Sequence, residues 1–393
     1  MIHNSRQRML AALSCHSAGV VPCSFMLFGG LWSESKDYLS FIKSQLDLGL
    51  DSYVQIPPRM PGLMNDSYNL HGLPVSYHPR VEIEEWIEKH PDRRYPTLVK
   101  IYHTPAGDLR TEVHQTDDWR WENHVPFLDD YLSSRSLKFL IQSPSDLEKL
   151  AYLLVPPAAA DLRDFRENSK SAVEFAAANN LLLVGGWGVG ADVLGWIFGL
   201  QNMLYAVYDS PDLIYNMLQM IASWNRSRMH VVLDAGIDLY IKRAWYENCD
   251  FWTPKNYQQY LAPILREEVD LAHSKGARFG YLITSNCMPL LEIIADCGVD
   301  VLIGVDPKQW DLDAAARILG GRVCLWGGVN GHLTVEKGSS EEVRTEVRQA
   351  MEILASTEGF ILSPVDNIRD FNPQAQENIL VLIAEWQRLT KSS

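Results

Sequence analysis

One stretch of the sequence constrains the fold more than any other, because it predicts a strand, a helix and a second strand in direct succession. It reads GARFGYLITSNCMPLLEIIADCGVDVLIGVDP, and its first apolar run, residues 279–283, ends in the polar cluster Thr284 to Asn286. Residues 289–297 have apolar side chains at helical spacing, and a second apolar run, 299–305, ends at Asp306. Parallel strands that are buried on both faces are continuous Val, Ile and Leu runs. The stretch therefore predicts one unit of an α/β fold with polar residues at the carboxyl ends of its strands.

The same alternation recurs along all 393 residues, and nearly every apolar run is followed by a segment with helical spacing. The predicted strands are residues 20–28, 50–56, 181–187, 237–243, 279–283, 299–305, 322–326 and 359–362. Eight sequential units without a low-complexity linker favour a single closed (β/α)8 TIM barrel over an open sheet, which would leave two edges to protect. The chain is therefore predicted to be one domain over residues 1–393.

Residues 60–140 interrupt this rhythm, because they are rich in Pro, His, Trp and charge. Within them, residues 98–103 and 109–114 flank the sequence TPAGD, which predicts a hairpin with a glycine in its loop. We interpret the segment as an insertion after the second strand that acts as a lid over one end of the barrel. Residues 81–90, with four glutamates, are predicted to be the solvated face of a helix.

Bulk composition excludes some classes of partner. The formal net charge is -14, which argues against nonspecific binding to nucleic acid or to anionic membranes, since both depend on a basic field. The first residues lack the apolar core of a secretory signal, and no run of 18 apolar residues occurs, so a cytoplasmic protein is expected. Six scattered cysteines without a CxxC pair predict reduced, mostly buried thiols.

The chemistry of such a barrel is expected where the strands end and the following loops begin. The candidate substrate-binding residues at these positions combine hydrogen-bonding groups with large aromatic rings, which is typical of a pocket for a flat organic molecule. They are Arg59, Trp187, Arg243, Trp245, Tyr246, Thr284, Ser285, Asn286, Asp306, Asn330 and Arg369.

Two carboxylates are the candidate catalytic residues. Glu247 lies in the sequence RAWYENCDFW, residues 243–252, which directly follows a predicted strand and is read as a pocket wall, with Glu247 as general acid or base. The alternative is a structural network of charged side chains under the barrel rim. Asp366 follows the last strand in SPVDNIRD and either pairs with Arg369 or points at the substrate.

No metal motif accompanies these residues. The sequence has no HExxH, and no closely spaced His and Cys pair follows a strand, so no metal site and no tightly bound cofactor are predicted. The glycine pairs at 29–30, 185–186 and 327–328 match no phosphate loop and are expected to let the backbone approach a ligand or a neighbouring strand.

With this strand order, the chain resembles the uroporphyrinogen decarboxylase superfamily, which includes that decarboxylase and corrinoid-dependent methyltransferases. The resemblance covers about residues 5–390 and rests on the hairpin around TPAGDL, on GVDVLIGVDP, on RVCLWGGVN and on GFILSP near the end. It implies a TIM barrel, a small-molecule substrate and, as a partner, either a corrinoid protein that carries the methyl group or a second copy of the chain.

Departures from the superfamily narrow the reaction. The decarboxylase has an arginine-bearing loop after its first strand, whereas this chain has residues 28–34, FGGLWSE, without an arginine. The zinc-dependent methyltransferases have a His-x-Cys pair and a later Cys, and the matching positions here are Leu282, Thr284 and Asp366. A substrate with eight carboxylates and a thiolate-activating zinc are therefore both disfavoured.

Three functions remain open at this point. The first is methyl transfer between a small substrate, such as a methoxylated aromatic, and a corrinoid protein. The second is decarboxylation of a small carboxylate or porphyrin-type substrate, with Arg243, Arg369 or Arg59 as the anchor. The third is non-catalytic binding of a tetrapyrrole or another small ligand.

Overall fold

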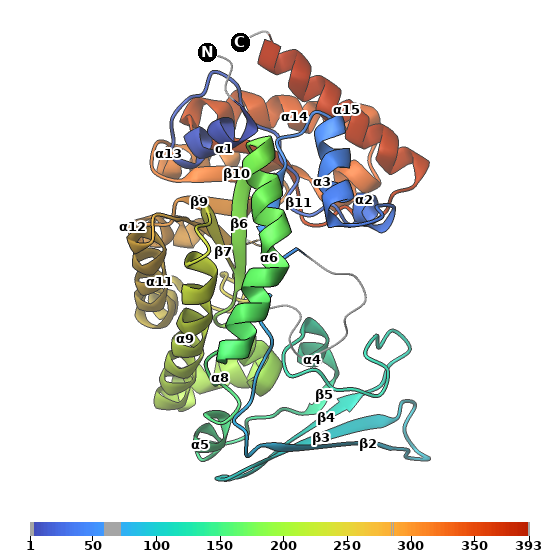
Figure 1. Ribbon diagram of the computed structural model, residues 1–393, viewed down its shortest axis with the longest axis vertical. Coiled ribbons are helices and arrows are strands. Elements are labelled where there is room, and N and C mark those ends of the chain that lie inside the picture. Colours follow the sequence, from blue (N-terminus) through green and yellow to red (C-terminus); the bar gives the residue numbers. More distant parts are fainter. Residues whose placement is uncertain (1–3, 59–71, 284, 286, 392–393) are drawn as a thin grey trace. The chain divides into compact units, whose positions relative to one another are not determined.

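Seven parallel strands form the main sheet of the protein in a computed structural model, which describes residues 4–58, 72–283, 285 and 287–391. The strands lie side by side in chain order (Figure 1). Four strands that come between the first and the second of them in the sequence form a separate antiparallel sheet. They are β1 (Tyr53–Ile56), β6 (Leu182–Gly188), β7 (Leu239–Arg243), β8 (Arg278–Leu282), β9 (Val301–Val305), β10 (Cys324–Asn330) and β11 (Phe360–Val365). The α/β class and seven of the eight predicted strands are confirmed.

The chain divides into two compact units. The first comprises the described parts of residues 1–60, 166–186 and 232–393, and it contains the parallel sheet except for the last two residues of β6. The second comprises the described parts of residues 61–165 and 187–231. The predicted insertion at 60–140 thus falls within a larger unit that also takes in later helical segments.

The predicted first strand, residues 20–28, is not a continuous strand. Cys23 and Leu27 form isolated parallel bridges to Leu362 and Asn367, and the Cys23 carbonyl accepts a hydrogen bond of 2.7 Å from the Asp51 N–H. The segment begins beside Pro22, which has no N–H to give to a ladder. It therefore lies along β11 without forming regular strand pairing.

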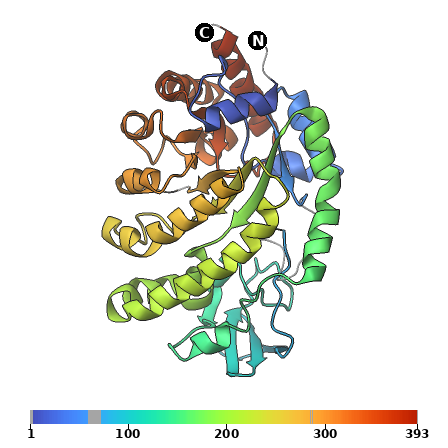
Figure 2. The same ribbon diagram turned by 60° about the vertical axis from the view of Figure 1, so that its left-hand side comes forward.

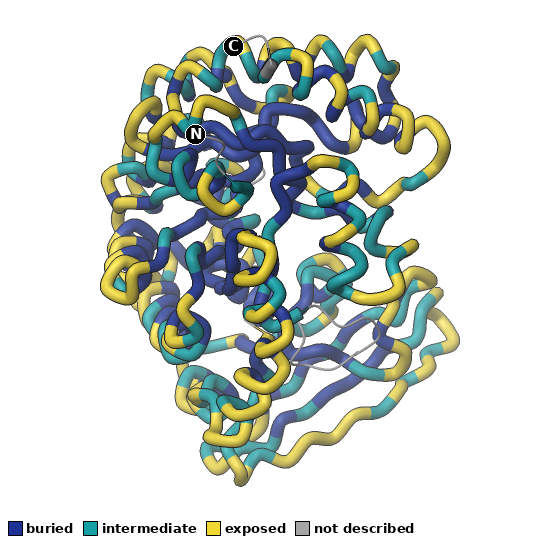
Figure 3. The backbone as a smooth tube through the Cα atoms, turned by 45° about the horizontal axis from the view of Figure 1, so that its top comes forward, coloured by how far each residue is buried: buried dark blue, intermediate teal, exposed yellow. Residues whose placement is uncertain are grey.

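Helices follow the strands of the first unit and bury the outer face of the sheet. The helices of its carboxyl-terminal half pack in sequence, each beside the next, and Figure 2 shows them outside the strands. They are α11 (Ala262–Ser274), α12 (Leu291–Asp296), α13 (Leu312–Leu319), α14 (Ser340–Leu354) and α15 (Pro373–Lys391). Strands β7, β9, β10 and β11 are buried along their whole length, whereas the outer helix faces are exposed (Figure 3).

Three helices lie in the amino-terminal part of the first unit. They are α1 (Ser5–Leu13), α2 (Gly29–Ser33) and α3 (Tyr38–Asp47), and the long helix α6 (Ala159–Asn179) runs from the second unit into the first. Asn4 and Gln7 cap α1 reciprocally, and the Asp37 side chain caps α3, so both helices begin at polar residues that accept backbone N–H bonds. Within the described residues, no helix combines the length and apolar character that crossing a membrane requires.

The second unit contains an antiparallel sheet. Its strands lie in the order β2 (Glu82–Glu88), β3 (Thr97–Thr104), β4 (Gly107–His114) and β5 (Ser136–Lys138). The predicted hairpin is confirmed as β3 and β4, with Thr104 opposite Gly107. The unit's other helices are α4 (Asp130–Arg135), α5 (Asp146–Leu150), α7 (Asp192–Leu194), α8 (Leu200–Asp209) and most of α9 (Pro211–Leu233).

The helix predicted at residues 81–90 is wrong, because this segment forms the edge strand β2. Its residues pair in antiparallel register with β3, from Glu82 opposite His103 to Glu88 opposite Thr97. Most of its side chains are exposed, as predicted, but glutamate's preference for helix is overridden by pairing with the hairpin. A row of charges on an edge strand also prevents pairing with other chains.

Candidate active site

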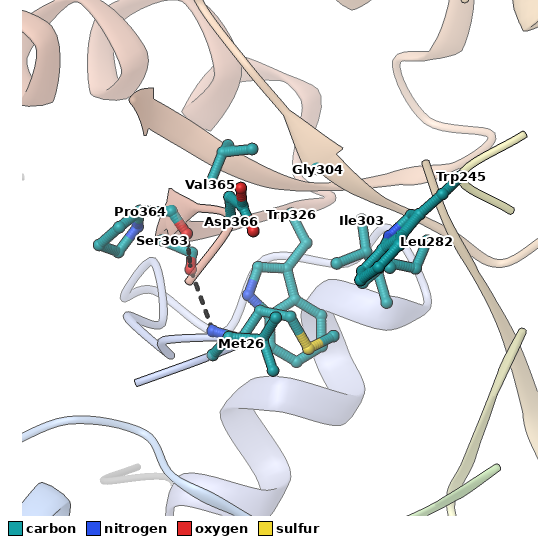
Figure 4. A pocket seen from close by; sticks show the side chains of 11 residues that line it. Met26, Trp245, Leu282, Ile303, Gly304, Trp326, Ser363, Pro364, Val365 and Asp366 are labelled. Atoms are coloured by element: carbon teal, nitrogen blue, oxygen red, sulfur yellow. Dashed lines mark hydrogen bonds between the residues drawn. The ribbon is translucent and has the colours of Figure 1, made fainter. Parts of the chain in front are cut away.

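A cavity opens at the carboxyl ends of four neighbouring strands of the first unit. It encloses about 320 Å³ of space free of protein atoms, including its open mouth. Figure 4 shows the side chains that surround it, which come from the ends of β8 to β11, from the loop after β7 and from the segment before α2. The lining residues are Met26, Leu27, Trp245, Leu282, Ile303, Gly304, Trp326, Ser363, Pro364, Val365 and Asp366.

The register of the sheet brings the apolar wall together. Leu282 lies opposite both Arg243 and Ile303, and Ile303 lies opposite Trp326. Residues directly opposite each other in parallel strands point to the same face of the sheet. Arg243 therefore shares the cavity face of the sheet with the three apolar side chains.

Trp326 is fixed in this wall by a hydrogen bond and a ring contact. Its Nε1 donates to the Ser24 carbonyl over 2.8 Å, and its ring meets the Tyr53 ring edge-on at 5.9 Å between centroids. The side chain has no exposed surface, so it presents a rigid aromatic face.

A glycine makes the bend at which β10 opens the cavity. The pairing of β10 with β9 shifts between Trp326 and Gly327, and Gly327 has φ of +152°. A Cβ atom there would lie 2.6 Å from the Val305 carbonyl oxygen. The glycine pair at 327–328 thus serves close approach of two strands, one of the two roles that the sequence predicted.

Asp366 lies at the mouth of the cavity in a constrained turn. Its φ is +69°, an uncommon value for a residue with a side chain, and its Oδ1 accepts a hydrogen bond of 2.8 Å from the Asn367 N–H. The Asn367 Oδ1 in turn accepts a bond of 2.8 Å from the Gly29 N–H, which begins α2. The turn is therefore held on both sides, with the Asp366 side chain exposed to a ligand.

Trp245, in the loop after β7, lines the same cavity as Asp366. The guanidinium carbon of Arg243 lies 3.8 Å from the centroid of the Trp245 ring. Figure 4 shows the ring extending from its loop towards Ile303 and Met26. Two predicted binding residues, Arg243 and Trp245, are thus in contact, although only Trp245 is part of the wall.

Glu247 does not line the cavity. It is 1% exposed, its Oε2 accepts a hydrogen bond from the Tyr281 hydroxyl, and its Oε1 lies 3.7 Å from Lys242 Nζ. Lys242 and Tyr281 are opposite each other in the register and point to the face of the sheet away from Leu282. Glu247 therefore belongs to a charged network outside the cavity, which is the structural alternative that the sequence left open.

The network extends to α11 and to a second tyrosine. Lys242 Nζ donates to Glu268 Oε2 over 2.8 Å, and the Tyr257 hydroxyl donates to the Tyr281 hydroxyl over 3.0 Å. Burial raises the pKa of Tyr257 and of Tyr281 well above the usual value, and the charge of Glu247 adds to both shifts. Both phenols are therefore held neutral.

Asp306 and Asn330, at the ends of β9 and β10, bind each other. The Asn330 Nδ2 lies 3.1 and 3.0 Å from the two carboxylate oxygens of Asp306, and both residues are buried. The Asn330 N–H donates to Glu346 of α14 over 2.9 Å. They brace the two strand ends and are not among the lining residues.

The other candidate binding residues lie apart from the wall. Arg369 is exposed, and its backbone N–H donates to Glu336 over 2.5 Å; no ion pair with Asp366 occurs among the described residues. Tyr246 packs against Phe251, and the Ser285 carbonyl accepts a bond from Trp310. Trp187 is half-buried with φ of +65° and belongs to the second unit.

Three candidates, Arg59, Thr284 and Asn286, lie outside the described residues. Within the described ranges, no group of three or more His, Cys, Asp or Glu side chains is arranged to hold a metal ion. Cys287, close in sequence to the polar cluster, is buried, and burial raises the pKa of its thiol well above the usual value.

Sequence reasoning missed most of the apolar wall. Leu282, Ile303 and Trp326 lie inside predicted strands, whereas the candidates were polar and aromatic residues at or after the strand ends. Alternation along each strand separates a cavity face from a helix face, which is the signal that identifies these positions once the register is known. The contribution of Met26 and Leu27 depends on the irregular segment beside β11 and has no such signal.

Comparison with a solved methyltransferase structure supports the fold. A methyltransferase from Methanosarcina mazei is similar to this chain with a TM-score of 0.59 and 18% identity, covering 99% of both chains. A B12-independent methionine synthase from Shewanella sp. W3-18-1 is similar with a TM-score of 0.46 and 10% identity, covering 95% of this chain and 98% of that one. A search of curated proteins by sequence finds no match.

The family is shown by a match over more than half of the chain. The model of uroporphyrinogen decarboxylase (URO-D) matches residues 138–375, a range that contains β6 to β11, the cavity wall except Met26 and Leu27, and the Asp366 turn. The chain therefore belongs to the uroporphyrinogen decarboxylase family.

Proposed function

We propose that this protein is an enzyme that transfers a methyl group between a small oxygen-bearing aromatic substrate, such as a methoxylated ring, and a corrinoid carried by a separate protein. The observation that carries the proposal is the composition of the cavity wall. Two indole rings and several aliphatic side chains surround it, and among the described residues that line it Asp366 is charged and none is cationic. Such a wall suits a flat, neutral molecule and does not suit a polycarboxylate.

The size of the cavity separates substrate from corrinoid. The cavity as it stands has room for about one water molecule, about 10 Å³, so a substrate ring would enter by displacing lining side chains. A corrinoid macrocycle is far larger than a single ring. A corrinoid would therefore approach the mouth on its own protein, where it supplies a metal centre that accepts or donates a methyl group.

The residues of the chain have distinct parts in this proposal. Trp326, Ile303 and Leu282 hold the ring and exclude water, because they are buried and fixed in the sheet. Asp366, at the mouth, passes a proton from water to the substrate oxygen as the oxygen–methyl bond breaks and the oxygen keeps the bonding electrons. The same carboxylate takes the proton back when the reaction runs in reverse.

Two further observations support the proposal. The similarity in fold to the Methanosarcina mazei methyltransferase is consistent with a methyl-transfer branch of the family. The bridges of Cys23 and Leu27 to the β11 side, with the Asp51 bond to Cys23, support a closed eight-stranded barrel around the cavity. A corrinoid protein as partner, a homodimer and a cytoplasmic location stay predictions.

The proposal is tested by mixing the purified protein with cob(I)alamin and a panel of methoxybenzenes and following the visible spectrum. We expect formation of methylcob(III)alamin, with a rate that Asp366→Asn lowers by about 10²-fold or more. Asp370→Asn is the matched control, since Asp370 is an exposed carboxylate near the same turn that does not line the cavity, and it should keep the rate. An unchanged spectrum with every donor, or full activity in Asp366→Asn, contradicts the proposal.

Decarboxylation of a small carboxylate is the second candidate, because Arg243 lies directly behind the cavity wall. A guanidinium there is the nearest anchor for an acid group. The Arg243→Ala and Arg369→Ala variants should then lose turnover of the carboxylate. Unchanged turnover in both removes this candidate.

A further inference from the structure

One wall residue of the cavity has a hydrogen-bond donor without a protein acceptor. The Nε1 atom of Trp245 is buried and makes no hydrogen bond to any residue that the structure describes, although the ring itself is part of the cavity lining. A buried N–H left without an acceptor costs about 1–3 kcal/mol, and native structures seldom retain one without cause.

The other buried tryptophans of the first unit show that this is an exception. Each of them donates its indole N–H to a backbone carbonyl at 2.8–3.1 Å. The pairs are Trp252 with Tyr246, Trp310 with Ser285, Trp326 with Ser24 and Trp386 with Val21. Trp245 thus differs from these four tryptophans, one of which, Trp326, also lines the cavity.

The cavity is the source from which an acceptor can come. The Trp245 nitrogen is buried and has no hydrogen-bond partner among the described residues, and its ring extends towards Ile303 in Figure 4. A ligand that displaces lining side chains beside this ring would bring an oxygen to the indole N–H.

Two charged groups near the Trp245 ring determine which kind of ligand oxygen can accept its indole N–H. The Arg243 guanidinium, 3.8 Å from the ring centroid, polarises the indole and makes its N–H a stronger donor. Asp366 lines the same cavity and repels a carboxylate. The combination favours a neutral acceptor such as an ether or a phenol.

We infer that Trp245 is the specificity-determining residue of the cavity, and that its indole N–H binds a neutral ether or phenol oxygen of a flat aromatic ligand. The inference deepens the proposed function, on which it rests for the substrate class. Binding of the ligand, however, requires no methyl transfer and is measured separately.

The test compares anisole with ethylbenzene, which have the same shape and differ by an oxygen in place of a methylene group. Calorimetric titration of the full chain should give anisole an affinity about three- to tenfold higher, the effect of one net hydrogen bond. Trp245→Phe keeps a flat ring under Arg243 and removes the donor, so the ratio should fall to about one. Trp386→Phe is the control, because its indole donates to the Val21 carbonyl and does not line the cavity, so its loss should leave the ratio unchanged.

A spectroscopic readout accompanies the titration and does not depend on activity. In a nitrogen–proton correlation spectrum, the indole resonance absent from Trp245→Phe is that of Trp245. It should move downfield with anisole and stay near its position with ethylbenzene. Benzoate should bind more weakly than anisole. The Asp366→Asn variant should reduce the difference in affinity between these two compounds.

The outcomes separate this inference from the proposed function. The inference is overturned if anisole and ethylbenzene bind with equal affinity, or if Trp245→Phe keeps the preference for anisole. Tighter binding of benzoate than of anisole, or no binding of any of the three compounds, also overturns it. A preference that depends on Trp245 in a protein that transfers no methyl group overturns the proposed function alone.

Discussion

Lys242 on β7 donates to Glu268 on α11 over 2.8 Å, with 2% and 0% of the two side chains exposed. This bond joins the sheet to its outer helix, and Glu247 lies on the other side of the same ammonium group at 3.7 Å. Two buried carboxylates therefore share one buried cation.

Removal of the Lys242 ammonium group is predicted to lower the stability of the protein. Lys242→Met removes the buried cation that Glu268 and Glu247 share, so the free energy of unfolding should fall by about 3–5 kcal/mol. The double variant Lys242→Met with Glu268→Met also removes the carboxylate that this cation binds but leaves Glu247 in place, so it should recover part of the loss. Urea denaturation of the two variants measures both effects, and equal losses in the two would contradict the role of the pair.

The turn at Asp366 predicts a difference between substitutions of similar size. Asp366→Asn keeps an oxygen that accepts from the Asn367 N–H and tolerates the φ of +69°, so stability should stay within about 0.5 kcal/mol of the wild type. Asp366→Val has a branched side chain in the same conformation and should lose about 1–3 kcal/mol. Thermal unfolding distinguishes the two, and a Val variant as stable as Asn would show that the turn is not strained.

The bend in β10 makes a third prediction. Gly327→Ala adds a Cβ atom 2.6 Å from the Val305 carbonyl oxygen at φ of +152°, and we expect a loss of more than about 2 kcal/mol. Gly321→Ala is the control, because it has φ of +73° but nothing within 4 Å of the added Cβ. Its loss should be about 1 kcal/mol, from backbone conformation alone. If denaturant titration gives the two variants the same stability, the close approach of β10 to β9 does not constrain residue 327.

Acid sensitivity is expected at the contact between α14 and α15. The hydrogen bond from Arg388 is the largest cause that lowers the pKa of Glu385 to about 2; burial opposes the shift and Arg348 adds to it. A carboxylate whose pKa falls on folding stabilises the protein above its unfolded pKa, and this contribution is lost as the pH falls from about 4.5 towards 2. Glu385→Gln should reduce the loss in the free energy of unfolding as the pH falls from about 4.5 towards 2. The effect should weaken in high salt, since both arginines are about half exposed.

The Glu385→Gln variant also shows which result would contradict this prediction. If its stability falls with acid as steeply as that of the wild type between pH 4.5 and 2, other carboxylates account for the acid sensitivity of the protein. Measurement at low and at high salt on the same two proteins separates the ion pair from these other groups.

The sequence by itself determined the strands and most of the helices, because a strand buried on both faces must be a continuous apolar run whatever its neighbours. It also placed Trp245 and Asp366 at strand ends, where the structure finds the cavity. It was wrong at residues 81–90, where pairing with β3 outweighs local preference, and at residues 20–28, which bridge β11 only at isolated points.

Only the tertiary structure decided which face of each strand a side chain occupies. Lys242 and Arg243 are adjacent in sequence, yet register with Tyr281 and Leu282 sends one to the helix layer and the other to the cavity side. The same distinction removes Glu247 from the cavity and brings Leu282, Ile303 and Trp326 into it. A loop's direction and a sheet's register are set by contacts between residues far apart in the chain, so local sequence determines the elements and long-range packing determines the site.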